Sequence, residues 1–551
     1  MGMSEINPEF KSTFAANIFN NKYARYEGQT WEDKAAEVVK SVTENLMPPD
    51  MQDELRGHIK SMRFMPGGRY LYYSGRQAKM YNNCYLLKGE EDTREEWGSL
   101  ARRSSDALMS GGGIGIDYSV FRPSGSPLGR TGGVASGPIP LMQSINEVGR
   151  NVMQGGSRRS AIYASLNWRH GDAEEFLRIK DWHKMEVVPG VSLWDAKQHN
   201  FNFPAPLDMT NISLNYDNAF LDRVQSGQLP PLFIENVRQA MMTGEPGFSF
   251  NFGDKENETL RNACTEVTSE DDSDVCNLGS VNMGAIDTID EFRDVVRLSV
   301  GFLVCGTITA DLPYAKVYEV RRKNRRLGLG LMGIHEWLLK RGYSYEVNPE
   351  LRKWLEVYRE ESERSANALC DRLSISRPVA YRAIAPTGTI GIIAGTTTGI
   401  EPLFAVAYKR RYLVDGTKWK YEYVVDSTAE GLIQSHGLNP NKIETSLSLV
   451  DDPERRIRFQ ADVQDYVDQA ISSTINLPSW GSDTNNDDRV EAFARTLSQY
   501  APRLRGFTVY PDGARGGQPL THCSYKEAVR HKGVVFEENS DAACGGGVCG
   551  L

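Results

Sequence analysis

Several features that would place a chain of this length in a membrane, outside the cell or on nucleic acid are missing from the sequence. No run of about 18 apolar residues occurs, so no transmembrane helix is expected. Residues 1–10 are polar and acidic and lack the apolar core of a signal peptide, which predicts a cytoplasmic protein. Lys and Arg number 63 against 72 Asp and Glu, and the net charge of -9 argues against a general nucleic-acid binder.

The cysteines are too sparse for a disulfide framework, which a reducing compartment would oppose in any case. No CxxC pair occurs, and no histidine stands at metal-ligand spacing beside two cysteines, so no metal site is expected. Cysteines of this kind are either part of the core or reactive. The eight are Cys84, Cys264, Cys276, Cys305, Cys370, Cys523, Cys544 and Cys549.

What remains is ordinary globular composition, with 40% hydrophobic and 25% charged residues in 551. The length fits three or four average domains, or one large α/β body with additions. Residues 1–63 predict a small helical region, because apolar residues recur at near-helical spacing from Trp31 to Leu46 before Pro48 and Pro49.

From Phe64 the pattern changes to alternating strands and helices, which predicts α/β architecture. A helix is expected over Arg94–Met109, followed by a strand after Gly111–Gly113. We also expect the helix around Glu319 to run into the glycine-rich segment 327–333. The basic run at 321–326 is interpreted as a solvated helix face.

One short segment combines groups that could do chemistry: Asn262-Ala263-Cys264-Thr265-Glu266. If it is extended, Asn262, Cys264 and Glu266 point to one side, because side chains alternate along a strand. An amide, a thiol and a carboxylate together could hold and activate a polyol. The alternative is a buried structural cysteine between two polar residues, and the five residues alone favour it, since free cysteine is usually buried.

Three loops could bind anions or could be plain connectors. Residues 122–137 and 155–160 are glycine-rich, and Arg158 and Arg159 in the second would suit phosphate. The turn Pro386–Ile390 precedes an expected helix start, where backbone N–H groups favour phosphate. This turn lacks the lysine of a Walker loop, so an ATPase is not expected.

The C-terminal segment carries Cys544 and Cys549 among glycines. It is either a disordered end or a mobile dithiol. We favour the dithiol, because an exposed free cysteine is otherwise a liability.

Taken together, these motifs resemble the catalytic subunit of a ribonucleotide reductase, over residues 64–551. The resemblance rests on Asn262, Cys264 and Glu266, on Asn83-Cys84, on the segment 276–280, on the turn Pro386–Ile390 and on the pair Cys544 and Cys549, in the family's order.

The resemblance implies a ten-stranded α/β barrel made of two five-stranded parallel halves, with an internal loop that carries Cys264. It implies three regions: helices over 1–63, the barrel over 64–535 and a flexible redox tail over 536–551.

It also implies roles for single residues. Cys264 would carry a transient thiyl radical, Glu266 would act as base, and Asn262 would hold the ribose hydroxyls. Cys84 and Cys276 would supply two reducing equivalents. Cys544 and Cys549 would restore that pair by thiol–disulfide exchange with a thioredoxin or glutaredoxin type of reductant.

Ligand contacts follow from the same resemblance. The ribonucleotide would meet Asn83, Gly115 and the turn Pro386, Thr387, Gly388, Thr389 and Ile390. A deoxynucleoside triphosphate effector would meet Arg130, Arg158 and Arg159, near the interface of a homodimer.

The radical source divides this family. Residues 507–512 hold no pair of adjacent tyrosines, and no glycyl-radical motif is seen, so the chain is most similar to the adenosylcobalamin-dependent branch. No cobalamin-binding motif is found, so the residues that contact the cofactor stay unassigned. Two alternatives remain: a catalytic subunit that needs a separate metal-bearing radical subunit, and a non-catalytic nucleotide-binding redox sensor.

Overall fold

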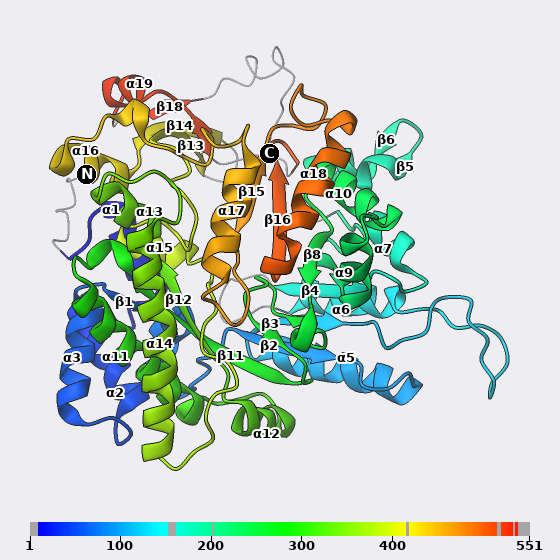
Figure 1. Ribbon diagram of the computed structural model, residues 1–551, viewed down its shortest axis with the longest axis horizontal. Helices are drawn as coiled ribbons and strands as arrows, with labels where there is room; N and C mark the ends of the chain where they lie inside the picture. The colour runs from blue at the N-terminus through cyan, green and yellow to red at the C-terminus, as the bar shows by residue number, and fades with distance from the viewer. Residues whose placement is uncertain are drawn as a thin grey trace.

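The computed structural model describes residues 9–152, 161–200, 203–414, 418–514, 520–532 and 535–537. Helices surround a central set of strands, and the N-terminal helices pack at one side (Figure 1). Among the described residues, no helix combines the length and the apolar character needed to cross a membrane.

Three helices open the described chain: α1 (Thr13–Lys22), α2 (Trp31–Thr43) and α3 (Pro49–Lys60). Thr30 and Asp33 form a capping box that starts α2, and this fixes where the helix begins. The apolar stripe predicted there is buried, so the expected helix is confirmed, although it ends before Leu46.

Five parallel strands form one half of a barrel. They are β2 (Cys84–Lys88), β3 (Gly113–Asp117), β4 (Ile162–Asn167), β7 (Thr210–Tyr216) and β8 (Gly247–Phe250). Parallel neighbours need long crossover connections, and helices such as α5 (Arg94–Met109) and α6 (Ile139–Asn151) provide them. The helix predicted at 94–109 and the strand after Gly111–Gly113 are confirmed.

The second half consists of β11 (Asp274–Asn282), β12 (Leu327–Met332), the segment 382–384, β15 (Thr474–Leu477) and β16 (Gly506–Pro511). Neighbours in this half are again parallel, and isolated bridges at Leu329↔Arg382 and Ile384↔Ile471 connect β12 to the chain that enters β15. Antiparallel pairing of β11 with β2 and of β16 with β8 joins the halves. The pairings therefore close a ring, as expected of a ten-stranded α/β barrel.

The glycine-rich segment 327–333 departs from the expected helix. Helix α12 (Ala315–Asn324) ends at Arg325, which has a left-handed φ of 42°, and β12 follows. A Cβ on Gly328 would lie 2.4 Å from Leu278 Cδ2, and one on Gly330 would lie 2.8 Å from Ala383 O. The alternate glycines let strands of the second half pack closely, which explains why the segment is a strand.

The basic run 321–326 is a solvated helix face only at Arg322 and Lys323, which are exposed. Arg321, Arg325 and Arg326 are buried, and each donates to an acceptor inside the fold. Guanidinium groups with several fixed donors can bind interior carbonyl and carboxylate oxygens, so this part of the run connects elements instead of facing solvent.

The remaining elements surround the barrel. The other helices are α4 (Gly68–Tyr73), α7 (Ala173–Arg178), α8 (Leu193–His199), α9 (Asn218–Gln225), α10 (Pro231–Thr243), α11 (Ile289–Thr309), α13 (Ile334–Lys340), α14 (Pro349–Arg372), α15 (Gly388–Ala394), α16 (Ser427–His436), α17 (Pro453–Gln464), α18 (Asp487–Tyr500) and α19 (Tyr525–Arg530). The other strands are β1 (Phe64–Pro66), β5 (Glu186–Val188), β6 (Val191–Ser192), β9 (Leu260–Arg261), β10 (Thr268–Ser269), β13 (Ala407–Val414), β14 (Lys418–Val425), β17 (Leu520–His522) and β18 (Val535–Glu537).

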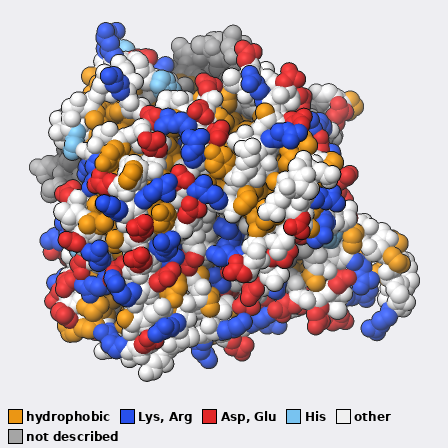
Figure 2. Space-filling model, viewed as in Figure 1, with side chains coloured by type: hydrophobic (Ala, Val, Ile, Leu, Met, Phe, Trp, Pro, Cys, Tyr) orange, Lys and Arg blue, Asp and Glu red, His pale blue; other side chains and the backbone are white. Residues whose placement is uncertain are grey.

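Two large apolar clusters hold this arrangement. One joins the N-terminal helices to α11, α14 and the second half-barrel, and the other lies between the first half-barrel and its covering helices. On the face in Figure 2, basic and acidic side chains are interspersed over the surface. A third, smaller apolar cluster consists of Leu86, Leu260, Val267, Cys276, Leu278 and Ala383, and it adjoins the candidate site.

Candidate active site

A short hairpin inside the barrel carries the central residues. Strands β9 and β10 pair with Thr268 opposite Arg261, and the turn between them holds residues 262–267. A Cβ on Gly115 would lie 1.6 Å from Arg261 O, so the hairpin backbone is pressed against β3. On the other side, Ala470 N donates to Glu266 O at 2.8 Å. The hairpin is therefore fixed between the two half-barrels.

The turn is not extended, contrary to the geometry considered from the sequence. Thr265 has a φ of 70°, and its N–H donates to Asn262 O at 3.0 Å. Asn262 and Glu266 are buried, whereas Cys264 at the tip is exposed. The three residues thus belong to one tight turn and differ in their exposure, which period-two alternation would not produce.

Asn262 connects this turn to the nearest strand. Its Oδ1 accepts from Val267 N at 3.0 Å, and its Nδ2 lies 3.3 Å from Cys84 Sγ as donor. The side chain is fully buried, so both of its polar ends are used within the site. The amide of Asn262 therefore lies between the turn and the Cys84 thiol, and its role in holding a ribose stays a prediction.

Cys84 and Cys276 face each other across the junction of the half-barrels. They are direct partners in the antiparallel pairing of β2 with β11. Residues opposed in this way have Cα atoms about 4.5–5.5 Å apart, which lies inside the range that disulfides span. A Cβ on Gly328 would lie 2.9 Å from Cys276 Sγ, so glycine at 328 leaves room for the thiol.

Burial changes the acid–base properties of the cluster. It raises the pKa of Glu266 to about 7, and Glu266 Oε2 has no hydrogen-bond partner among the described residues. Burial, with the nearby Glu266 carboxylate, raises the pKa of Cys84 to about 12. The pKa of Cys276 also lies well above its ordinary value, mainly through burial. Both thiols are therefore protonated at neutral pH.

Two site residues escaped the sequence reasoning. Arg326 donates through Nε to Asp274 at 2.9 Å, and its charge acts on Cys276 to lower the thiol's pKa against the effect of burial. Gln469 Oε1 accepts from Thr268 N, and its Nε2 donates to Leu327 O at 2.6 Å. Arg326 was hidden in a basic run, and an isolated glutamine carries no sequence signal.

The predicted phosphate turn begins α15. Thr387 is buried with a left-handed φ of 51°, and its hydroxyl accepts from Gly399 N at 2.8 Å. Pro386 and Gly388 are exposed, Thr389 is half-buried and Ile390 is buried. The hydroxyl of Thr387 thus connects the turn to the backbone at Gly399, and the exposed residues of the turn are Pro386 and Gly388.

The turn lies at the carboxyl end of the second half-barrel, because the segment 382–384 leads directly into Pro386. Cys84 is the first residue of β2 and pairs with Cys276, the third residue of β11. The cysteine pair therefore lies toward the amino end of β11, and the rest of that strand runs from the pair toward the end of the barrel that holds the turn.

The structure places three other residues that were predicted to contact substrate or effector. Asn83 lies next to Cys84, and its Oδ1 is buried without a partner among the described residues. Gly115 is covered by the hairpin, which gives it a packing role, and its contact with substrate stays a prediction. Arg130 is exposed at the tip of the loop after β3, which extends away from the body (Figure 1).

Some predicted residues cannot be placed. Arg158, Arg159, Cys544 and Cys549 lie outside the described residues. The remaining cysteines, Cys305, Cys370 and Cys523, are all buried away from the hairpin.

Comparison with known proteins finds similarity to ribonucleotide reductases. The family profile "Ribonucleotide reductase, barrel domain" matches residues 82–258, 232–357 and 377–501. A vitamin B12-dependent ribonucleoside-diphosphate reductase of Mycobacterium tuberculosis is 26% identical over 89% of this chain and 74% of its own length. A protein of Mycobacterium phage D29, named as a putative adenosylcobalamin-dependent ribonucleoside-triphosphate reductase, is 27% identical over 91% of this chain and 81% of its own.

Among solved structures, the alpha subunit of a class Id ribonucleotide reductase from Actinobacillus ureae superposes with a TM-score of 0.70. It covers 92% of this chain and 98% of that chain at 16% identity, so the likeness concerns the fold. The family profile spans most of the sequence, including the strands that carry the cysteine pair. The chain belongs to the ribonucleotide reductase family.

Proposed function

We propose that the chain reduces ribonucleotides to 2′-deoxyribonucleotides through a thiyl radical on Cys264. One observation carries the proposal: a single turn holds the exposed Cys264 with a buried acid, Glu266, and is hydrogen-bonded to one of two opposed thiols, Cys84 and Cys276. A nucleotide-binding redox sensor has no need of an acid and an amide beside these thiols.

The proposed reaction balances with these groups. The Cys264 thiyl takes the hydrogen atom from C3′, and the Glu266 carboxylate accepts the proton of the 3′ hydroxyl. The 2′ hydroxyl leaves as water. Cys84 and Cys276 together give up two electrons and two protons and become a disulfide. One of these protons leaves with the 2′ hydroxyl as water, and the other proton with the two electrons forms the new C2′–H bond. Glu266 returns its proton to the 3′ oxygen, and Cys264 returns the hydrogen atom to C3′, which restores the thiyl.

Adenosylcobalamin is the proposed source of the radical, on the basis of the relatives' names and the absence of adjacent tyrosines at 507–512. When bound, it supplies a carbon-centred radical through homolysis of its cobalt–carbon bond. The exposed position of Cys264 suits this, because that thiol must be reached from outside while Asn262 and Glu266 stay shielded from water. The residues that hold the cofactor stay unassigned.

The other partners follow from the proposed reaction. Asn83 and the turn Pro386–Ile390 would hold the substrate, with phosphate at the backbone of Gly388 and Thr389. Arg130, Arg158 and Arg159 would bind a deoxynucleoside triphosphate effector near the interface of a homodimer. Cys544 and Cys549 would pass electrons from a thioredoxin or glutaredoxin type of protein. Thiols in this role must be kept reduced, which suits a cytoplasmic location.

The decisive experiment uses the purified chain with a ribonucleoside diphosphate or triphosphate, dithiothreitol and adenosylcobalamin, and no second protein. We expect deoxyribonucleotide with wild-type chain and none with Cys264→Ser. Cys523→Ser, a cysteine remote from the hairpin, is the matched control and should keep its activity. Activity that requires an added iron or manganese protein would refute the cobalamin assignment and leave the reductase assignment in place.

A further inference from the structure

The helix that starts at the turn Pro386–Ile390 is held at its other end by a residue near the start of the described chain. Helix α15 has seven residues, and Gly395 ends it with a left-handed φ of 63°. The Gly395 carbonyl accepts from Lys11 Nζ at 3.1 Å and from Thr428 Oγ1 at 3.0 Å. Lys11 therefore contacts the end of α15 that lies opposite the turn.

The Lys11 side chain fits closely at this position. A Cβ on Gly395 would lie 2.6 Å from Lys11 Cδ, so glycine both adopts the left-handed backbone and leaves room for the lysine stem. The ammonium also lies 3.7 Å from Oε1 of Glu336, whose side chain is 5% exposed. A cation at the carboxyl end of a helix interacts favourably with the helix dipole. Lys11 itself is 56% exposed, so its replacement leaves the core intact.

Glu336 connects Lys11 to the loop that follows α15. The Thr396 hydroxyl donates to Glu336 Oε2. The same loop continues to Gly399, whose N–H donates to the Thr387 hydroxyl at 2.8 Å. The loop therefore runs from the pair of Lys11 and Glu336 back to the turn from which α15 starts.

The residues before Lys11 are fixed to α2. Phe10 is buried, and its ring centre lies 5.4 Å from that of Phe19 and 6.3 Å from that of Trp31. Glu9 accepts from Trp31 N at 2.9 Å, at the first residue of α2. Lys11 thus extends toward α15 from a backbone that is held in place.

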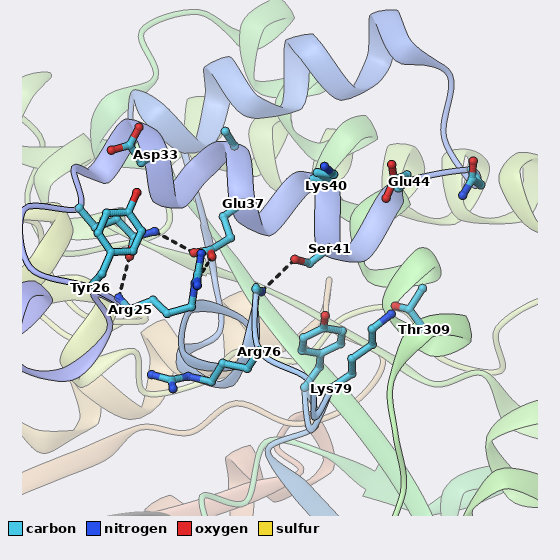
Figure 3. A pocket seen from close by; sticks show the side chains of 15 residues that line it. Arg25, Tyr26, Asp33, Glu37, Lys40, Ser41, Glu44, Arg76, Lys79 and Thr309 are labelled. Atoms are coloured by element: carbon cyan, nitrogen blue, oxygen red, sulfur yellow. Dashed lines mark hydrogen bonds and ion pairs between the residues drawn. The ribbon is translucent and has the colours of Figure 1, made fainter.

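Helix α2 is itself connected to its surroundings on both sides. Glu37 accepts from Arg25, and from Gln29 Nε2 at 2.8 Å, which joins the chain after α1 to α2 (Figure 3). Ser41 Oγ accepts from Gly75 N at 3.0 Å, which joins α2 to the segment after α4 (Figure 3). The N-terminal helices therefore form a rigid support for Lys11.

Helix α1 also packs directly on α15 (Figure 1). Ala15, Ala16 and Phe19 of α1 belong to the same apolar cluster as Ile390 and Ile393 of α15. The N-terminal region thus contacts α15 in two ways, by apolar packing of α1 and by the polar contacts of the lysine that precedes it.

We propose that Lys11 is a positioning residue for substrate binding at the turn Pro386–Ile390. The inference rests on the proposed function, which assigns this turn to the ribonucleotide. Because α15 is only about 10 Å long, a displacement of its carboxyl end also displaces the turn. Lys11 fixes that end at Gly395. Through Glu336 it also fixes the loop that returns to Thr387.

Hydrogen exchange of the full chain, measured by mass spectrometry with increasing CDP or CTP, tests the inference. Protection of the peptide that covers residues 386–396 gives a Kd for nucleotide at the turn. Lys11→Met keeps the length of the side chain and removes the ammonium, and it should raise this Kd about fivefold, the effect of one hydrogen bond of average strength. Lys11→Arg keeps a charged donor and should stay within about twofold of wild type.

Lys60→Met is the matched control, because Lys60 is an exposed lysine of α3 whose ion pair is with Glu32 of α2. In steady-state assays Lys11→Met should raise KM for the ribonucleotide about fivefold and leave kcat within about twofold of wild type. A lysine that only stabilised the fold would lower the melting temperature and leave the Kd of the folded chain unchanged.

The possible outcomes separate this inference from the proposed function. Protection that Lys11→Met leaves at the wild-type Kd would refute the inference alone. So would an equal rise of the Kd in Lys11→Arg or in Lys60→Met. If neither nucleotide protects the turn in the wild-type chain, the assignment of the turn to substrate is wrong, and the inference is wrong with it.

Discussion

Glu266 is a single residue whose environment makes a prediction about stability. Its pKa is raised from 4.5 to about 7 by burial, so between these pH values the folded chain binds more protons than the unfolded chain. The free energy of unfolding must then fall as pH rises through this window. Glu266→Gln removes this dependence. The variant should gain on wild type between pH 5 and pH 8, by on the order of 3 kcal/mol.

Urea unfolding of both proteins at pH 5 and pH 8 measures the difference. The comparison across pH cancels any constant effect of the substitution. A Glu266→Gln difference that is the same at both pH values would mean that the carboxyl titrates in the folded chain as it does in the unfolded one.

The same residue makes a prediction about turnover. If the Glu266 carboxylate is the base, kcat/KM should fall below about pH 7 with a slope of one proton, because the carboxyl becomes protonated. Glu266→Gln should lose activity by about 10²- to 10⁴-fold and lose this acidic limb. The measurement is deoxyribonucleotide formation from pH 5.5 to 9. A variant that keeps the limb would assign it to another group.

At the scale of elements, the hairpin depends on one glycine of β3. Gly115→Ala places a methyl group 1.6 Å from Arg261 O, so the hairpin must move. A shift of about 1 Å at a reacting group can cost about 100-fold in rate, and we expect at least that loss. Gly98→Ala in α5 is the matched control, since its Cβ meets nothing within 4 Å.

The control should keep full activity and gain up to about 1 kcal/mol of stability, because alanine is the better helix former. Activity assays and thermal melts separate the two variants. Wild-type activity in Gly115→Ala would show that the hairpin position does not limit catalysis.

The pairing of β2 with β11 predicts which disulfide turnover forms. In a chain whose Cys544 and Cys549 are replaced by serine, one turnover without added reductant should leave Cys84 bonded to Cys276, because their strands oppose them directly. Peptide mapping without reduction identifies the bond. A disulfide that includes Cys264, or none after product has formed, would contradict the assignment of the pair.

The elements differ in how far the sequence could predict them. Helix Arg94–Met109 has its own cap and period, so its bounds followed from local sequence. The strand Leu327–Met332 did not, because its alternate glycines serve contacts with Leu278 and Ala383 that are distant in the chain. The isolated bridges at Arg382 and Ile384 are likewise fixed by their neighbours and carry no strand pattern.

In the site too, local sequence motifs predicted some residues, whereas contacts between distant parts of the chain determine others. Motifs predicted Asn262, Cys264, Glu266 and the cysteine pair, whereas the extended geometry considered for residues 262–266 is not the one they adopt. The left-handed backbone position in this turn is occupied by Thr265 and not by a glycine, so no residue type in the sequence indicates the turn. Arg326 and Gln469 were missed because their partners, Asp274 and Thr268, are supplied by the fold.

At the scale of the whole molecule, the closed barrel creates a problem of access. Cys84 and Cys276 are buried at the junction of its halves, and the pKa of each thiol is raised by that burial. Such a pair is protected from wasteful oxidation, yet a folded reductant protein cannot reach it. A chain segment with its own dithiol resolves the conflict, since it can enter where a globular protein cannot.

The burial of the cysteine pair predicts that turnover responds differently to a small thiol and to a reductant protein. Replacing Cys544 and Cys549 by serine should leave turnover with dithiothreitol within about twofold of wild type, because a small thiol reaches the barrel without help. Turnover with thioredoxin, thioredoxin reductase and NADPH should fall to the single-turnover level. The paired measurement is product formed over time with each reductant, and Cys523→Ser serves as the control that keeps both. Equal loss with both reductants would place the two tail cysteines in the reaction itself, and no loss with thioredoxin would mean that the reductant reaches the buried pair directly.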